Sequence, residues 1–327
     1  MKGMYVLSGD AYEKIYGPRE REEIGGLVEI IGRQQTAESI KADRSMLSEI
    51  DVIISGWGMA ELDKELLDAA PRLKAIFYGA SSVKYFMTEH AWDREIAITS
   101  AYGANAIPTA EYALSQILFS LKRGWHFART IEQQKRYPSR KRAPGGYNST
   151  VGIVSLGMVG SYVAKLLQGF DVSVLAYTSN EGKADSLGAE ARSLEEIFAL
   201  SDVVSLHTPL LPETEGMISA KHLSLMKHEA TLINTARGAI VRQRELIEVL
   251  RQRPDLYAIL DVTDPEPPES DSSLFLLPNV VLTPHIAGSM GAECRRLGRY
   301  MVDELRRFLN DEPLRWSITR GDMARLA

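Results

Sequence analysis

Short apolar runs alternate with segments of helical spacing along the whole chain. In the first hundred residues, the runs expected to form strands are 4–7, 27–31, 51–55, 73–77 and 96–99. The segment 62–69 has the spacing of a connecting helix. Because each apolar run is short and is bounded by turn residues, the pattern predicts a small α/β unit.

The pattern changes after residue 100. Asn105 and Pro108 are expected to mark a turn, and a long apolar helix is predicted over 113–125. Glu111 would then lie in the first turn of that helix, where the helix dipole favours a carboxylate. This stretch is a candidate hinge between two parts of the chain.

The segment 129–148 is rich in positive charge, proline and glycine, and a solvated connecting loop is its expected structure. Cofactor phosphates or a partner subunit are alternative uses of this charge. The basic residues are Lys135, Arg136, Arg140, Lys141 and Arg142.

Residues 150–170 predict a strand, a glycine-rich turn and a helix. In that arrangement the backbone N–H groups of the turn and the positive end of the helix dipole suit a pyrophosphate. Gly157 would allow a close approach to the phosphates, and Gly160 would allow helix and strand to pack closely. The dinucleotide fingerprint begins with glycine, but Ser155 holds that position here.

A regular series follows the turn. Further strands are predicted at 173–177, 203–207, 231–235, 257–262 and 280–283, and helices at 194–200, 221–226 and 245–252. Six strands with intervening helices predict a doubly wound parallel sheet of the Rossmann type. The regular series therefore supports the imperfect fingerprint.

The residues after the second strand of this series bear on the choice of cofactor. An NAD site would place Asp or Glu there to hold the ribose 2′-hydroxyl. The sequence instead reads Ala-Tyr-Thr-Ser-Asn over 176–180, with Lys183 a little further on. This neutral end does not repel a 2′-phosphate, yet it has no arginine to hold one, so the choice between NAD and NADP stays open.

Composition excludes several other classes of protein. The 327 residues carry a net charge of −5, which argues against a dedicated nucleic-acid binder, and no apolar run approaches membrane-spanning length. The N-terminus lacks the apolar region of a signal peptide, and the single cysteine, Cys294, fits a reducing compartment. We therefore expect a cytoplasmic protein without nucleic-acid or membrane partners. The spacing of His and Cys predicts no metal site.

Three polar residues follow consecutive predicted strands. Counted from the strand of the glycine-rich motif, Arg237 follows the fourth strand, Glu266 follows the fifth and His285 follows the sixth. Open α/β sheets bind their ligands at the carboxyl ends of such strands. Each has a simple structural alternative: a surface ion pair, a solvated loop acid and a core histidine, respectively. Together, after a dinucleotide turn, they indicate a site around a nicotinamide.

These motifs give the chain a family resemblance. The order Asn-Thr-Ala-Arg-Gly over 234–238, Asp-Val-x-x-x-Glu-Pro over 261–267 and Thr-Pro-His over 283–285 resembles the D-isomer-specific 2-hydroxyacid dehydrogenases. That family includes phosphoglycerate dehydrogenases and glyoxylate/hydroxypyruvate reductases. The resemblance implies an NAD(P)-dependent oxidoreductase that moves a hydride to or from C2 of a small 2-oxo or D-2-hydroxy acid.

The resemblance also implies roles for individual residues. The catalytic trio would be Arg237, Glu266 and His285, and the substrate carboxylate would meet Tyr78, Gly79 and Asn105 as well as Arg237. The residues implied in cofactor binding are Gly157, Met158, Val159, Gly160, Thr178, His207, Thr208, Pro209, Thr235, Ala236, Asp261 and Gly288.

The family fold implies how the chain is organised. A flavodoxin-like substrate domain would comprise residues 1–102 and 289–327, with the NAD(P)-binding Rossmann domain of residues 103–288 inserted into it. The helix around 297–309 would cross back to the N-terminal unit. A homodimer formed through the dinucleotide domain, with 129–148 near the contact, is also implied.

This chain departs from the family pattern at several positions. Ser155 replaces the first glycine, Met158 replaces an arginine common in the turn, and Ser-Ser-Val-Lys over 81–84 replaces a loop that commonly has Asp or Asn. The last change bears on which acid is bound. Glu266 is retained where formate dehydrogenases of the superfamily carry Gln, and this favours 2-hydroxy acids.

The expected chemistry follows from where charge develops. His285 would donate a proton to the C2 oxygen during reduction and accept it in the reverse direction, with Glu266 orienting its ring. Arg237 would hold the substrate carboxylate and the C2 oxygen. Two alternatives stay open. One is a nicotinamide-binding co-repressor of the same fold. The other is a phosphoglycerate dehydrogenase, although the chain is expected to lack room for the regulatory domain of long forms.

Overall fold

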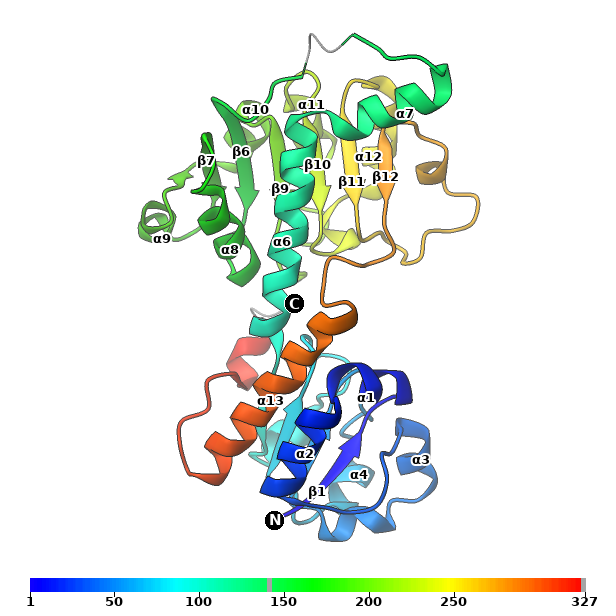
Figure 1. Ribbon diagram of the computed structural model, residues 1–327, viewed down its shortest axis with the longest axis vertical. Coiled ribbons are helices and arrows are strands. Elements are labelled where there is room, and N and C mark those ends of the chain that lie inside the picture. Colours follow the sequence, from blue (N-terminus) through cyan, green and yellow to red (C-terminus); the bar gives the residue numbers. More distant parts are fainter. Residues whose placement is uncertain (140–142, 325–327) are drawn as a thin grey trace. The chain divides into compact units, whose positions relative to one another are not determined.

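A computed structural model describes residues 1–139 and 143–324 of the protein. The chain forms two compact units (Figure 1). The first comprises Met1–Asn105 with Ser289–Ala327, and the second comprises Ala106–Gly288. The boundary lies after residue 105, whereas the sequence placed it after 102, because the helix that starts at Tyr102 has its first residues in the first unit.

The first unit is built on a sheet with the strand order β13-β5-β4-β3-β1-β2. All neighbours are parallel except β13, which runs antiparallel to β5. The strands are β1 (Lys2–Val6), β2 (Glu29–Ile30), β3 (Val52–Ser55), β4 (Ala75–Tyr78), β5 (Ala97–Ser100) and β13 (Ser317–Ile318).

Helices cover both faces of this sheet, because successive strand residues point to opposite sides. In β3, Ile53 packs into one buried apolar cluster, and Val52 and Ile54 pack into the other. The α-helices of this unit are α1 (Gly9–Ile15), α2 (Pro18–Leu27), α3 (Ala37–Ala42), α4 (Lys64–Ala69), α5 (Glu89–Asp93) and α13 (Cys294–Leu309). The result is a flavodoxin-like arrangement, as the sequence predicts.

Helix α13 returns the end of the chain to this unit. Leu297, Met301 and Leu305 recur every four residues, so they share one face of the helix, and all three are buried with α1 and α2. On its outer side, Arg299 donates two hydrogen bonds to the Glu23 carboxylate, at 2.5 and 3.0 Å. This contact lowers the pKa of Glu23 to about 2.

The second unit contains a seven-stranded sheet in which all neighbours are parallel, in the order β12-β11-β10-β9-β6-β7-β8 (Figure 1). Its strands are β6 (Ser149–Val154), β7 (Val172–Tyr177), β8 (Glu190–Ala191), β9 (Val203–Leu206), β10 (Thr231–Asn234), β11 (Tyr257–Leu260) and β12 (Val280–Leu282). The strand order reverses between β6 and β9, which is the switch point where a doubly wound sheet binds its ligand. The predicted fold class is therefore confirmed.

The α-helices of this unit are α6 (Tyr102–Leu121), α7 (Gly124–Gln134), α8 (Met158–Leu167), α9 (Glu181–Ser186), α10 (Leu194–Leu200), α11 (Ala220–Leu225) and α12 (Gln243–Gln252). Among them, α10, α11 and α12 follow the predicted series closely. A capping box at Ser193 begins α10: the Ser193 hydroxyl accepts from the Glu196 amide at 3.3 Å, and the Glu196 carboxylate accepts from the Ser193 amide at 3.0 Å.

Helix α6 corrects the expected turn at Asn105 and Pro108. Both residues lie inside the helix, and Glu111 is in its interior rather than in its first turn. A proline inside a helix costs about 3 kcal/mol through the lost hydrogen bond and a steric clash. The buried alanines Ala104 and Ala110, one in the core of each unit, anchor the helix on both sides of Pro108 and offset that cost.

Helix α7 is a second correction, because the basic segment expected to be a loop is helical up to Gln134. Helix α6 ends at Leu121, and the chain turns through Arg123, whose φ is 53°, before α7 begins. Lys135 and Arg136 lie just beyond α7 and are exposed, whereas Arg140, Lys141 and Arg142 fall outside the described residues.

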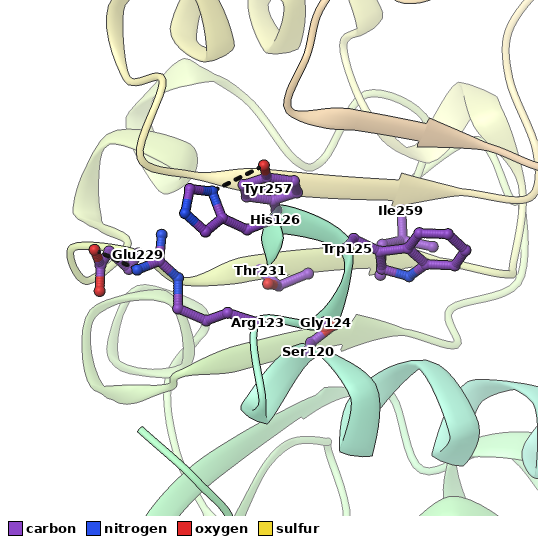
Figure 2. A pocket seen from close by; sticks show the side chains of 9 residues that line it. All are labelled: Ser120, Arg123, Gly124, Trp125, His126, Glu229, Thr231, Tyr257 and Ile259. Carbon is purple, nitrogen blue, oxygen red and sulfur yellow. Dashed lines mark hydrogen bonds and ion pairs between the residues drawn. The ribbon is translucent and has the colours of Figure 1, made fainter. Parts of the chain in front are cut away.

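Polar contacts hold α7 to the amino ends of β10 and β11, around a small pocket (Figure 2). Arg123 forms a largely buried ion pair with Glu229 at 2.6 Å, and His126 Nδ1 lies 3.3 Å from Tyr257 Oη. Farther along the helix, Arg129 donates to the Pro278 carbonyl at 2.7 Å. No residue of α7 is itself buried, so these contacts fix the helix while one of its faces stays open.

Candidate active site

The predicted strand, turn and helix of the dinucleotide motif are β6, residues 155–157 and α8. Ser155 adopts a φ of 78°, the left-handed conformation that glycine adopts without strain and that explains the usual glycine at this position. Ser155 therefore keeps the backbone conformation that glycine has at this position. The chain differs from the fingerprint in residue type and not in the shape of the turn.

The two glycines of the turn meet different surroundings. A Cβ on Gly160 would lie 2.1 Å from the Ser155 carbonyl oxygen, so helix and turn pack too closely for any side chain. A Cβ on Gly157 would meet only the Ser155 hydroxyl, at 3.9 Å. Because Gly157 is the N-cap of α8, this open space lies where a pyrophosphate would meet the helix N-terminus.

The hydroxyl of Thr235, which follows β10, also fits a bound cofactor. Among the described residues, the buried Thr235 hydroxyl, just after β10, has no hydrogen-bond partner. Buried polar atoms are nearly always satisfied, so this hydroxyl is a candidate ligand for a bound group. The Asn234 side chain closes the loop around it, accepting from the Ala236 amide at 3.0 Å and donating to the Arg237 carbonyl at 2.9 Å.

The other predicted cofactor residues lie at strand ends of the same sheet. The His207 amide donates to the Val154 carbonyl at 3.0 Å, and the Thr208 hydroxyl donates to the same oxygen at 3.3 Å, so this loop lies against the end of β6. The Thr214 hydroxyl donates to the Pro209 carbonyl at 2.6 Å. Burial lowers the pKa of His207 to about 4, so its ring is neutral at pH 7.

Glu266 and His285 form a direct pair. His285 Nδ1 lies 2.6 Å from Glu266 Oε1, and both side chains are about half exposed. His285 has a φ of 54°, and its amide donates to the Asp261 and Thr283 carbonyls, both at 3.0 Å. The pair therefore rests on a tightly turned loop whose backbone is fixed.

Arg237 lies close to this pair. Burial lowers the pKa of its guanidinium, and the Glu266 carboxylate acts in the opposite direction. The next residue, Gly238, makes the approach possible, because a Cβ there would lie 2.0 Å from the Thr263 carbonyl. The predicted trio thus occupies adjacent loops at the carboxyl ends of β10, β11 and β12.

A pocket of about 510 Å³ opens beside the trio within the second unit. Glu266 and His285 form part of its wall, and Phe275 and Leu282 give it an apolar side. The arrangement combines a paired imidazole with a nearby cation. It can therefore transfer a proton to a ligand oxygen and hold an anionic group.

Asp261 has a role that the sequence did not reveal. One carboxylate oxygen accepts from the Thr283 hydroxyl at 2.7 Å and the Ile286 amide at 2.8 Å, and the other accepts from the Ala287 amide at 2.8 Å. Tyr112 of α6 supports the same network through the Thr283 hydroxyl at 2.9 Å. Asp261 therefore shapes the His285 loop, whatever it contributes to a cofactor.

The residues predicted to meet the substrate carboxylate lie in the first unit. Tyr78, the last residue of β4, is buried, and its hydroxyl lies 2.7 Å from that of Tyr85. The Gly79 amide donates to the Ser55 carbonyl at 2.8 Å, so it belongs to the sheet ladder. Asn105 accepts from the Ser289 amide at 2.8 Å, which ties together the two points where the chain leaves and re-enters this unit.

Two negative findings apply to residues 1–139 and 143–324. No helix there combines the length and apolar character needed to span a membrane. Over the same ranges, no three His, Cys, Asp or Glu side chains are arranged to hold a metal ion.

Comparison with known proteins identifies the class to which this site belongs. Residues 115–287 match the family model of the D-isomer specific 2-hydroxyacid dehydrogenase, NAD binding domain. The chain therefore belongs to the D-isomer-specific 2-hydroxyacid dehydrogenases, which are oxidoreductases that use a nicotinamide cofactor. The predicted family, enzyme class and NAD(P) cofactor are confirmed.

Individual relatives support this membership. The chain is 35% identical over 260 residues to the glyoxylate reductase of Thermococcus kodakarensis, covering 77% of this chain and 78% of that protein. It is 31% identical to the D-3-phosphoglycerate dehydrogenase of Archaeoglobus fulgidus, where the match covers 78% of this chain but about half, 49%, of that longer protein. The D-mandelate dehydrogenase of Rhodotorula graminis shares the fold, with a TM-score of 0.81, 23% identity and 98% of both chains covered.

The two glycines of the turn give a matched pair of variants. Gly160→Ala should lower the free energy of unfolding by about 1–3 kcal/mol, because its Cβ would overlap the Ser155 carbonyl. Gly157→Ala should unfold like the wild type yet bind dinucleotide more weakly, because its Cβ would occupy the space beside the α8 N-terminus. Chemical denaturation and nucleotide titration of both variants test this. Equal effects of the two alanines on stability would contradict it.

His207 makes stability depend on pH. Between pH 7 and pH 5 the unfolded chain binds a proton at this residue, whereas the folded chain does not until about pH 4. The free energy of unfolding should therefore fall by about 2 kcal/mol over that interval on account of His207 alone. Denaturant unfolding at both pH values should show a smaller fall for His207→Gln. The exposed His90→Gln should behave like the wild type, and identical slopes for all three proteins would refute the assignment.

Proposed function

We propose that the protein interconverts a small 2-oxo acid and the corresponding D-2-hydroxy acid, with Arg237, Glu266 and His285 as its catalytic residues. The observation that carries this proposal is the 2.6 Å contact between His285 and Glu266, with Arg237 near enough for Glu266 to affect its pKa. A proton donor, its orienting carboxylate and a cation are the groups that carbonyl reduction requires.

The second unit would bind the cofactor and the first unit the substrate. The open space at Gly157 and the unpartnered Thr235 hydroxyl fit a dinucleotide along the strand ends of the second unit. When bound, a reduced nicotinamide supplies the hydride. The remaining proposed cofactor contacts lie at the same edge of the sheet: Met158 and Val159 begin α8, and Thr178, Ala236 and Gly288 lie in loops after β7, β10 and β12.

Each residue of the trio would act on the substrate differently. His285 would give its proton to the C2 oxygen as that oxygen gains negative charge, and in the reverse direction it would remove the proton. Glu266, which holds Nδ1, leaves Nε2 of the ring to face the substrate. Arg237 would hold the carboxylate and the developing charge on oxygen.

In the first unit, Tyr78, Gly79 and Asn105 define where the substrate carboxylate is proposed to bind. The Gly79 amide already donates to Ser55, so this glycine would serve mainly by letting the backbone pack closely against Ile15 and Tyr16. Amides further along the loop, from Ser81 to Val83, are the better candidates for donating to the carboxylate. This loop also carries the departures from the family pattern, so it would determine which acid is bound.

Replacing single members of the trio should separate their roles. We expect His285→Asn to reduce kcat about 10²- to 10⁴-fold, because proton transfer contributes that much, and Arg237→Met to weaken acid binding as well as turnover. The assay follows the loss of reduced-nicotinamide absorbance with glyoxylate, hydroxypyruvate, pyruvate and phenylpyruvate. His90→Asn, on the exposed helix α5, is the matched control and should keep full activity.

Two results would overturn this proposal. One is a His285→Asn protein with wild-type turnover. The other is a wild-type protein that binds dinucleotide tightly but reduces none of these acids, as a co-repressor of the same fold would.

We also propose that two copies of the chain associate through α7. None of its residues is buried, and Phe127 and Ile131, one turn apart, line an apolar pocket with the exposed Tyr137. Phe127 and Ile131 are partly buried and Tyr137 is exposed, so they form an apolar surface at α7 and just beyond it, and such a surface favours a protein interface.

The proposal of a reducing, cytoplasmic compartment rests on Cys294, which is buried and forms no disulfide.

Sedimentation analysis tests the dimer directly. The wild type should sediment with twice the chain mass of 36.3 kDa, and Phe127→Glu with Ile131→Glu should yield the monomer. Gln133→Glu, on an exposed part of the same helix, is the control and should leave the dimer intact. A monomeric wild type at tens of micromolar would contradict the proposal.

A further inference from the structure

We infer that the end of β7 recognises the 2′-phosphate of NADP and that Lys183 is the residue that selects it. This inference deepens the proposed function, because it rests on a dinucleotide lying along the strand ends of the second unit. It concerns which of two cofactors is bound, a choice that the sequence leaves open.

The backbone turn after β7 is neutral. β7 ends at Tyr177, and the following Thr178 and Asn180 use their side chains within the turn. The Thr178 hydroxyl accepts from the Asn180 amide at 3.2 Å, and the Asn180 side chain accepts from the Lys183 amide at 2.9 Å. No carboxylate occupies the strand end where an NAD site would hold the ribose 2′-hydroxyl.

The Lys183 ammonium lies against the glycine-rich turn. Its Nζ donates to the Leu156 carbonyl at 2.5 Å, directly before Gly157. The charge is therefore held between the proposed pyrophosphate site and the end of β7, where the adenosine ribose of a dinucleotide lies in this fold. An ammonium has three donors, so two stay available for a further acceptor.

Among residues 1–139 and 143–324, Lys183 forms no ion pair, although Glu181 and Asp185 lie on the same short helix, and its Nζ contacts the Leu156 carbonyl instead. By contrast, the neighbouring Arg192 is paired with Glu190. Arg192 follows β8, the strand that pairs with β7. Because Ala191 aligns with Ala176, Arg192 is next to Tyr177 in the register of the two strands. A 2′-phosphate here would meet one free cation and one that is already neutralised.

These observations favour NADP over NAD. The 2′-phosphate would gain charge-assisted hydrogen bonds from Lys183, which are roughly twice as strong as neutral ones. The 2′-hydroxyl of NAD would lack the carboxylate that ordinarily accepts its hydrogen bond. The contact between Lys183 and Leu156 would also place the ammonium before the cofactor arrives, so little side-chain freedom is lost on binding.

Calorimetric titration of the protein tests the inference without any turnover. We expect 2′,5′-ADP to bind about tenfold more tightly than 5′-AMP, and NADP to exceed NAD by a similar factor, because a hydrogen bond to a charged group typically contributes that much. Lys183→Ala should abolish the difference while changing NAD affinity less than about twofold. Lys183→Glu should reverse the preference. Lys165→Ala, an exposed lysine on α8, is the matched control and should keep the wild-type ratio.

Two outcomes would overturn the inference. One is NAD binding as tightly as NADP. The other is an equal loss of both cofactors in Lys183→Ala, which would mean that Lys183 only holds the turn at Leu156. The proposed function fails separately, when a dinucleotide binds but no 2-oxo acid is reduced, and in that case the ratio of the two affinities still decides the role of Lys183.

Discussion

The arrangement of the candidate site depends on the hydrogen bonds that the Asp261 carboxylate accepts. This carboxylate ends β11 and receives the Thr283 hydroxyl and the amides of Ile286 and Ala287. Hydrogen bonds to an ionised acceptor are stronger than hydrogen bonds between neutral groups. The donors here lie on both sides of His285 in the sequence. His285 lies between those donors, so its left-handed backbone conformation is imposed from both sides. Asp261 therefore helps to fix the imidazole relative to Glu266, together with the direct contact between the two side chains.

In the neighbouring loops too, polar side chains form hydrogen bonds with backbone groups of the same loop. Asn234 spans the loop of Arg237, and Thr178 and Asn180 shape the turn after β7. Short strands bring these loops to one edge of the sheet, and their internal hydrogen bonds fix the direction of each chemical group. The candidate site is thus a set of preformed loops on a rigid support, which is what precise positioning of reacting atoms demands.

Much of this was predictable from the sequence because the signals are local. Apolar runs bounded by turn residues located most strands, and the carboxyl ends of parallel strands necessarily meet, which brought Arg237, Glu266 and His285 together in the prediction. The two-residue strands β8 and β13 were not predicted, whereas β2, equally short, lies within the apolar run 27–31. The roles proposed for the individual site residues remain predictions.

The errors arose where distant contacts outweigh local preference. Pro108 suggested a turn, but α6 passes through it because the alanines on either side are buried in the cores of the two units. Charge in 129–148 suggested a loop, yet Arg123 and Arg129 have partners far along the chain that hold α7 in place. The structural role of Asp261 was not predicted, because nothing in its sequence neighbourhood reveals the three donors that reach it from beyond residue 280. Its contact with the cofactor stays a prediction.

The hydrogen bond between Asn105 and Ser289 has a consequence for how such a chain could arise. The second unit leaves the first after residue 105 and returns at residue 289, and the Ser289 amide donates to the Asn105 side chain at 2.8 Å, so the two connections are adjacent. An ancestral flavodoxin-like unit would therefore need only one surface break to accept the whole second unit, since the ends of the insertion are already adjacent. At one end of the insertion, however, helix α6 runs on from Tyr102 to Leu121 without interruption, so that connection is a continuous helix and not a loop.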